Sequence, residues 1–121
     1  MYNYYFVHKI VNEPSFLQFE LNRLLQLERD IRASGPVAEA GWAIDTSGGK
    51  FARARPPRVK GNAIGKTIAL SKVSGIEHRD WQLKIQRRNA LQEIARRAIS
   101  IQAMIDNPIW QPEGLNSSSP H

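Results

Sequence analysis

The sequence contains no cysteine, and this absence excludes several kinds of chemistry at once. Disulfide frameworks, zinc sites with thiolate ligands and cysteine nucleophiles all require the missing side chain. Long apolar runs are also missing, since no window approaches the roughly 20 apolar residues of a membrane-spanning helix. Residues 1–9 lack the basic stretch followed by an apolar run that marks a secretory signal. We therefore expect a cytoplasmic protein without a membrane span.

Histidines are few and widely separated in the sequence, at His8, His78 and His121. They share no ligand spacing with carboxylates, so we expect no metal and no cofactor. The segment 61–66 has three residues between its glycines, where a phosphate loop has four. The tripeptide 78–80 matches the catalytic loop of kinases, but a chain of 121 residues is too short for that fold. We predict that the protein is not an enzyme.

Negative charge is absent from the segment 50–72, which we call the basic segment. The chain carries 17 Lys and Arg against 11 Asp and Glu, a net charge of +6, and the rest of the chain is close to neutral. Clustered cations gain free energy on phosphate through counterion release. The pattern therefore predicts a surface that binds a polyanion. Its candidate residues are Lys50, Arg53, Arg55, Arg58, Lys60, Lys66 and Lys72.

Turn-forming residues between short apolar stretches predict a hairpin within residues 41–73. Its arms are 41–45 and 50–55, joined by a four-residue loop over 46–49. Two prolines end the second arm, because proline cannot donate to a strand ladder. A short strand over 67–71 is expected to follow. The remaining stretch forms a basic loop that contains glycine and proline.

An extended basic segment would set its cations in pairs. Side chains alternate along a strand, so Arg53 and Arg55 are expected to share one face, and Arg58 and Lys60 to repeat that geometry. Such a ribbon suits contacts to successive phosphates. Two aromatic residues, one on each arm of the hairpin, are candidates for stacking on bases or for anchoring an interface; they are Trp42 and Phe51.

Proline and glycine punctuation predicts a first helix over 14–34. Pro14 suits the first turn, where its missing N–H is not needed. Gly35 is expected to stop the helix in a left-handed conformation. Leucines recur through this stretch at the spacings of three and four residues that place them on one helical face. This segment is predicted to be an amphipathic helix.

A second helix is predicted over 76–106, where apolar side chains form two arcs. Two arcs indicate more than one neighbour, so the pattern allows a homo-oligomer through this helix. Arg87 falls close to one arc, so its stem is expected to pack there. Its guanidinium is expected to pair with an acidic residue of the first helix, such as Glu20 or Glu28.

Together these elements predict the α+β class, with two long amphipathic helices packed with a small antiparallel sheet. One domain over 1–110 would also include a strand over 2–11, and 111–121 would be a disordered tail. The predicted function is non-catalytic binding of nucleic acid, DNA or RNA, through the basic segment. The alternative is a structural or adaptor subunit of a larger assembly, whose basic arm and tryptophans dock on an acidic partner protein.

Overall fold

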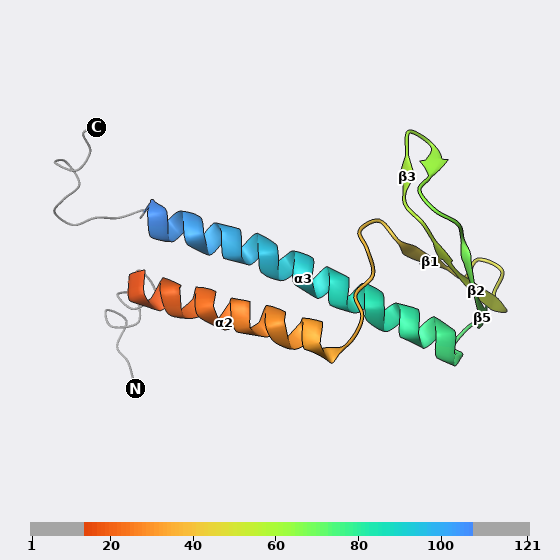
Figure 1. Ribbon diagram of the computed structural model, residues 1–121, viewed down its shortest axis with the longest axis horizontal. Helices are drawn as coiled ribbons and strands as arrows, with labels where there is room; N and C mark the ends of the chain where they lie inside the picture. Colours follow the sequence, from red (N-terminus) through yellow and green to blue (C-terminus); the bar gives the residue numbers. More distant parts are fainter. Residues whose placement is uncertain (1–13, 108–121) are drawn as a thin grey trace. The chain divides into compact units, whose positions relative to one another are not determined.

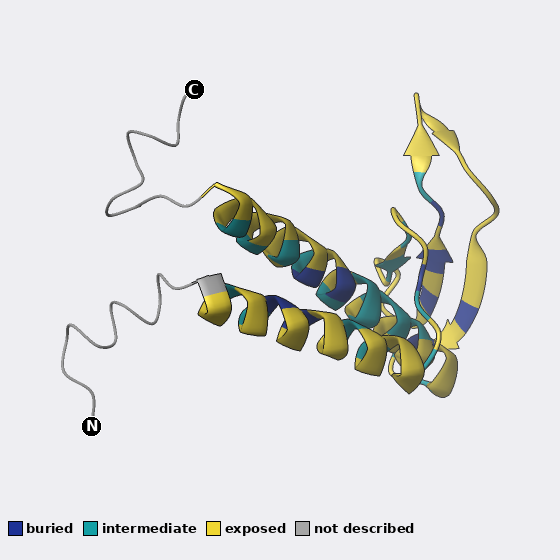
Figure 2. Cartoon of the chain, turned by 60° about the vertical axis from the view of Figure 1, so that its left-hand side comes forward, coloured by how far each residue is buried: buried dark blue, intermediate teal, exposed yellow. Residues whose placement is uncertain are grey.

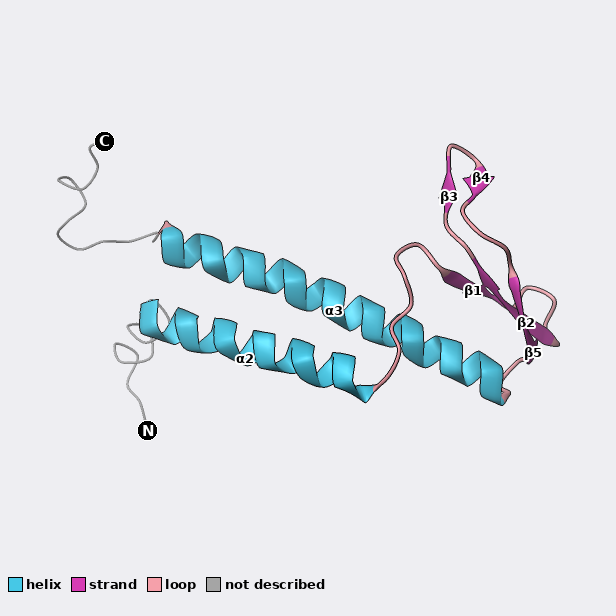
Figure 3. Cartoon of the chain, in the orientation of Figure 1, coloured by secondary structure: helices cyan, strands magenta, loops and turns pink. Residues whose placement is uncertain are grey.

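A computed structural model describes residues 14–107, which contain two helices and a small antiparallel sheet (Figures 1 and 3). This content confirms the α+β class. The predicted strand over 2–11 and the predicted tail over 111–121 lie outside the described residues. The chain divides into two compact units, one made of 1–28 and 93–121 and the other of 29–92. Neither described helix is long and apolar enough to cross a membrane.

Helix α2 covers Pro14–Ser34, and its first two thirds belong to the first unit. There it lies antiparallel to the last part of helix α3, Ile76–Asp106 (Figure 1). The buried residues among those described in this unit are Leu21 and Leu24 of α2 and Ile94 of α3. Leu21 and Leu24 are three residues apart and therefore lie on the same face of α2. The opposite faces of both helices are exposed (Figure 2). A narrow apolar seam is therefore the core of this unit.

The start of α3 is fixed by side chains of its own first turn. His78 is buried, and its Nδ1 accepts a hydrogen bond from the backbone N–H of Ser74 at 2.8 Å. Arg79 Nε donates to the carbonyl oxygen of Ser74 at 3.1 Å. These two bonds satisfy the backbone N–H and the carbonyl oxygen of Ser74, just before the helix begins. The first turn of a helix lacks intrahelical partners for its N–H groups, so side-chain contacts here help to define where the helix starts. His78 and Arg79 thus have a structural role at the beginning of the helix.

The sheet of the second unit has the strand order β1-β2-β5, with both pairs antiparallel. Strand β1 is Ala43–Asp45, β2 is Phe51–Arg55 and β5 is Ile68–Lys72. Along β2 the alternate residues 52 and 54 are buried alanines, whereas 51, 53 and 55 are exposed. The buried alanines pack with residues of β5 and α3, so this face of the sheet is the core of the unit. The cluster comprises Ala52, Ala54 and Leu70, with Trp42, Ile44, Val73 and Trp81 packed against it.

The register of the hairpin differs from the prediction. Asp45 pairs with Arg53, so the connection between β1 and β2 is longer than the four residues expected. The backbone N–H of Ser47 bonds to Asp45 Oδ1 and the N–H of Gly49 to the carbonyl of Thr46, which closes this turn. Local side-chain bonding of this kind changes loop length without a strong sequence signal.

A second, smaller hairpin occupies the stretch predicted to be a loop. Strands β3, Arg58–Val59, and β4, Asn62–Ala63, are antiparallel and joined by Lys60 and Gly61. The φ angles of these two residues are 53° and 84°, the positive values that a two-residue type I′ turn requires. Lysine is uncommon at such an angle, and Asn-Gly is the pair that marks this turn in sequences. We call 58–63 the hairpin arm.

Two arginines of α3 hold the connection between α2 and the sheet. Arg87 donates to the carbonyl of Ser34 at 3.2 Å, to the Ser34 hydroxyl at 3.1 Å and to the carbonyl of Pro36 at 3.0 Å. Arg88 donates to the carbonyls of Glu39 and Trp42 at 3.2 and 2.7 Å. A cation at the C-terminus of a helix also favours its dipole. Arg87 therefore binds backbone and the Ser34 hydroxyl at the end of α2, contacts that the sequence-based pairing with Glu20 or Glu28 did not include.

Gly35 allows this contact by its lack of a side chain. A Cβ at this position would lie 2.6 Å from the Arg87 guanidinium carbon, closer than real contacts. Its φ is 156°, so it does not take the left-handed helical stop that was predicted. The residue is needed for the approach of Arg87.

We predict that Arg87→Ala lowers the free energy of unfolding by about 1.5–3 kcal/mol, because hydrogen bonds from a charged donor to the end of α2 are lost. Urea unfolding followed by circular dichroism measures this difference. The control is Arg96→Ala on the same helix, whose partner is Glu93 one turn away and whose loss should cost less than about 0.5 kcal/mol. Equal losses in the two variants would contradict the role of Arg87.

Candidate functional site

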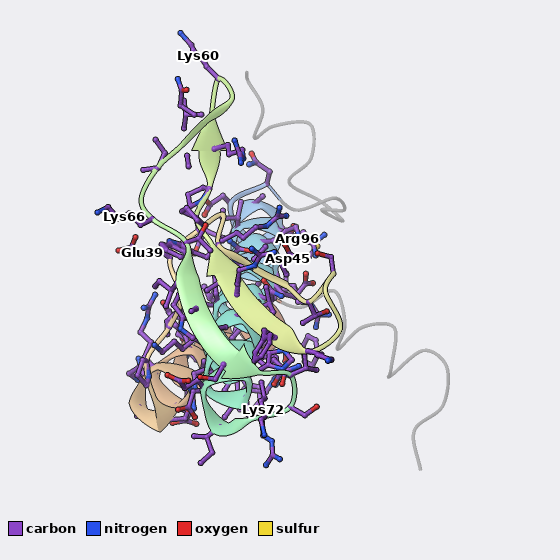
Figure 4. All side chains as sticks on the ribbon, turned by 90° about the vertical axis from the view of Figure 1, so that its right-hand side faces the viewer. Glu39, Asp45, Lys60, Lys66, Lys72 and Arg96 are labelled. Carbon is purple, nitrogen blue, oxygen red and sulfur yellow. The ribbon has the colours of Figure 1, made fainter. Side chains whose placement is uncertain are left out.

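The cations of the basic segment are all exposed, and all belong to the second unit. Figure 4 shows Lys60 at the tip of the hairpin arm and Lys72 at the far end of the sheet. Lys66 lies between these two lysines from top to bottom of the view. Arg53 and Arg55 lie on the outer face of β2, opposite the buried alanines. The strand brings these two arginines to one face, and Lys60 lies in the turn of the hairpin arm, outside the three-stranded sheet.

An irregularity in β5 adds Lys72 to the same outer face. Arg53 pairs with Ala69 but Phe51 pairs with Lys72, so β5 has one extra residue between these two pairs. Ser71 has a φ of 61°, the kind of local conformation that accompanies a β-bulge. Paired residues of an antiparallel sheet point to the same side. The bulge therefore aligns Lys72 with Phe51 and Arg53, and we call the set Phe51, Arg53, Arg55 and Lys72 the basic face.

Asp45 is the carboxylate that contacts the basic face. Its Oδ2 lies 3.5 Å from Arg53 Nη2 and 4.0 Å from Arg55 Nε. Hydrogen bonds from Ser47 hold the pKa of Asp45 below its usual range, and the two arginines lower this pKa further. The arginine side chains remain 55% exposed, while that of Asp45 is 17% exposed. The guanidinium groups are thus partly neutralised and still accessible.

Lysines and arginines of the basic segment differ in their contacts. Arg58 donates to the carbonyl of Gly61 at 3.0 Å, which ties it across the hairpin arm. Among residues 14–107 no ion pair joins a carboxylate to any lysine of the segment. The cations of the segment without an ion pair are therefore its four lysines and Arg58, whose bond to a carbonyl does not neutralise its charge; the lysines are Lys50, Lys60, Lys66 and Lys72.

The two aromatic candidates lie on opposite faces of the sheet. Trp42 packs against the core cluster, with its ring centroid 5.2 Å from that of Trp81. Phe51 is 62% exposed on the outer face. The observed register places it opposite Lys72, not across the hairpin from Trp42. Phe51 is therefore the more exposed of the two, and the half-buried Trp42 packs against the core cluster.

A shallow depression of about 280 Å³ lies where the sheet meets the hairpin arm. Arg55 and Arg58 both line it, together with Thr67 and the adjoining prolines. The lining of this depression thus includes one arginine of the sheet and one of the hairpin arm. An arginine can offer parallel N–H donors to the oxygens of one anion, so the depression suits a phosphate group.

The described residues form no group of three or more His, Asp or Glu that could hold a metal ion. Comparison of the chain with protein-family models, with curated proteins and with solved structures finds no match. The surface chemistry of the second unit is therefore the basis for inferring a function.

Because the pKa of Asp45 is lowered in the folded state, we predict that the contribution of this carboxylate to stability depends on pH. Because the folded-state pKa lies below the unfolded value of about 3.9, the ionised carboxylate stabilises the fold at neutral pH, and this stabilisation is lost as pH falls through the folded pKa. Asp45→Asn keeps an acceptor for Ser47 but has no such titration. Wild type should melt at a higher temperature than this variant at neutral pH, and the difference should shrink in acid. A difference independent of pH would contradict the assignment.

Proposed function

We propose that the protein is a non-catalytic nucleic-acid-binding protein that contacts the phosphate backbone through the basic face and the hairpin arm. One observation carries the proposal: all seven cations of the basic segment are exposed in one unit, and among the described residues only two of them, Arg53 and Arg55, form an ion pair, both with Asp45. A concentration of unpaired cations favours a partner with regularly repeated negative charge, because each contact releases a counterion.

The way in which these cations are held supports phosphate as the partner. The strand holds Arg53 and Arg55 on one face, and Arg58 donates to the Gly61 carbonyl. The planar guanidinium group matches the geometry of phosphate oxygens, and a guanidinium that is already held loses less conformational freedom on binding. The lysines add long-range attraction as mobile point charges. This combination favours contacts to backbone phosphates over readout of base sequence.

The arrangement of the tryptophans favours nucleic acid over docking on an acidic protein. That alternative relies on exposed tryptophan anchors, because aromatic hot spots carry much of the energy of protein interfaces. Trp42 and Trp81 contact each other against the core cluster, and Lys84 Nζ lies 4.8 Å from the Trp81 ring centroid. These rings are already used within the fold. Trp110 lies outside the described residues.

The test compares two double variants that each remove two positive charges from a net +6. Lys60→Asn with Lys66→Gln removes charges from the proposed surface, and asparagine tolerates the positive φ of position 60. Arg96→Gln with Arg97→Gln removes charges next to Glu93 in the first unit. Binding to labelled DNA and RNA is measured by fluorescence anisotropy over a salt series.

The lysine variant should bind roughly 25- to 60-fold more weakly at ~100 mM salt, and its log–log salt slope should be smaller by about 1.4–1.8, if both lysines contact phosphate. The arginine variant should bind like wild type. Equal losses in the two variants would indicate attraction by net charge alone. Absence of binding by folded wild type at low salt would overturn the proposal and direct the search to acidic proteins.

Asp45 is predicted to weaken binding, because it neutralises part of the charge of Arg53 and Arg55. Asp45→Asn retains an acceptor for the turn and removes the negative charge. We expect its affinity for nucleic acid to rise by about two- to fivefold at constant salt, the size of an exposed ion-pair effect. Glu39→Gln, which also removes one negative charge from the same unit, is the control. An equal rise in both variants would contradict a local role of Asp45.

A further inference from the structure

Phe51 is exposed because of the alternation of residues along β2. The sequence Phe-Ala-Arg-Ala-Arg places Phe51 on the same face as Arg53 and Arg55 in any extended conformation. Turning the strand over would bury the phenylalanine, but it would also bury both guanidinium groups at a high cost in desolvation. The fold therefore buries two small alanines and leaves an aromatic ring among cations.

Two cations are neighbours of Phe51 on the outer face. Its cross-strand partner is Lys72, and its neighbour along the same face of β2 is Arg53. Phe51 is also the only exposed aromatic residue of the range 29–92, since the other two, Trp42 and Trp81, are partly buried against the core. Other exposed apolar side chains of this unit, such as Val59 and Ile64, lack an aromatic face.

An aromatic ring beside cations matches single-stranded nucleic acid better than a duplex. In a duplex each base is covered above and below by its neighbours, so an aromatic side chain cannot stack on it without opening the stack. In a single strand the bases offer their faces, and proteins bind them by combining aromatic platforms with a basic track for the backbone. The ring of Phe51 has no groups that read base edges.

We infer that the ligand is single-stranded nucleic acid, that Phe51 stacks on one unpaired base, and that Lys72 and Arg53 contact the phosphates on either side of it. This inference rests on the proposed function. Because stacking needs only the face of a base, the contact is tolerant of sequence. The hairpin arm and Lys66 extend the basic track beyond the stacked base.

The experiment measures anisotropy of three labelled oligonucleotides with equal numbers of phosphates, using the full chain at one salt concentration. One is a single strand, one is the corresponding strand with all bases replaced by abasic sites, and one is a duplex. The protein variants are Phe51→Ala, Phe51→Trp and, as a control for loss of an exposed apolar side chain outside the proposed surface, Ile99→Ala on α3. Thermal melting verifies that each variant is folded.

Phe51→Ala should weaken binding to the single strand by about 5- to 150-fold, the range for loss of one stacked base, and leave binding to the abasic strand unchanged. Phe51→Trp should retain the affinity, and Ile99→Ala should bind like wild type. Equal binding of wild type to the normal and abasic strands would overturn the inference. So would preferential binding of the duplex with no effect of Phe51→Ala, although the proposed function would then stand. If wild type binds none of the oligonucleotides, the proposed function itself fails.

Discussion

The alternation of side chains along β2 is the constraint on which the second unit depends. A strand has a side-chain period of two, so the alanines at 52 and 54 and the arginines at 53 and 55 cannot lie on one face. Burying the alanines lets Trp42 and Trp81 approach the sheet closely, and it leaves the arginines in solvent. Core and charged surface are thus produced by the same five residues. A change that disturbed one would disturb the other.

Arginine and lysine are used differently in this protein. Four arginines of the second unit bind backbone carbonyls. Arg87 and Arg88 bind those of a distant segment, and Arg58 and Arg79 bind those of residues close in sequence. Planar guanidinium groups with several donors suit such contacts. Lys60 and Lys66 have no ion pair among the described residues. Counting total positive charge would therefore overstate the charge that is available to a partner.

Local patterns were sufficient for predicting the helices but not for placing their contacts. The helices cover 14–34 and 76–106, the ranges expected from proline, glycine and apolar spacing. The partners of Arg87 were missed because backbone carbonyl groups leave no trace in a sequence. The contact of Asp45 with Arg53 was missed for a similar reason, since it depends on the register: a four-residue loop would pair Asp45 with Lys50, whereas the structure pairs it with Arg53.

The hairpin arm was missed because its turn contradicts the usual signal. Lys60 adopts a left-handed angle that asparagine or glycine would take more readily, so the segment resembled an irregular loop. The sharing of one face by Arg53 and Arg55 was predictable from period alone. The separation of Trp42 from Phe51 was not, because the pairing of Phe51 with Lys72 is set by a third strand.

Strand alternation alone does not produce the basic face, because Lys72 joins it only through the bulge in β5. Without the extra residue, the pairing of Arg53 with Ala69 would continue to a pairing of Phe51 with Ser71, and Lys72 would point to the inner side. The positive φ of Ser71 costs conformational free energy, since a residue with a side chain disfavours that region. The hydrogen bond of the Ser71 hydroxyl to Glu77 Oε1 at 2.5 Å offsets part of this cost. A strained residue held by a specific bond thereby turns Lys72 outward beside Phe51, as bulges near functional sites often re-aim a side chain.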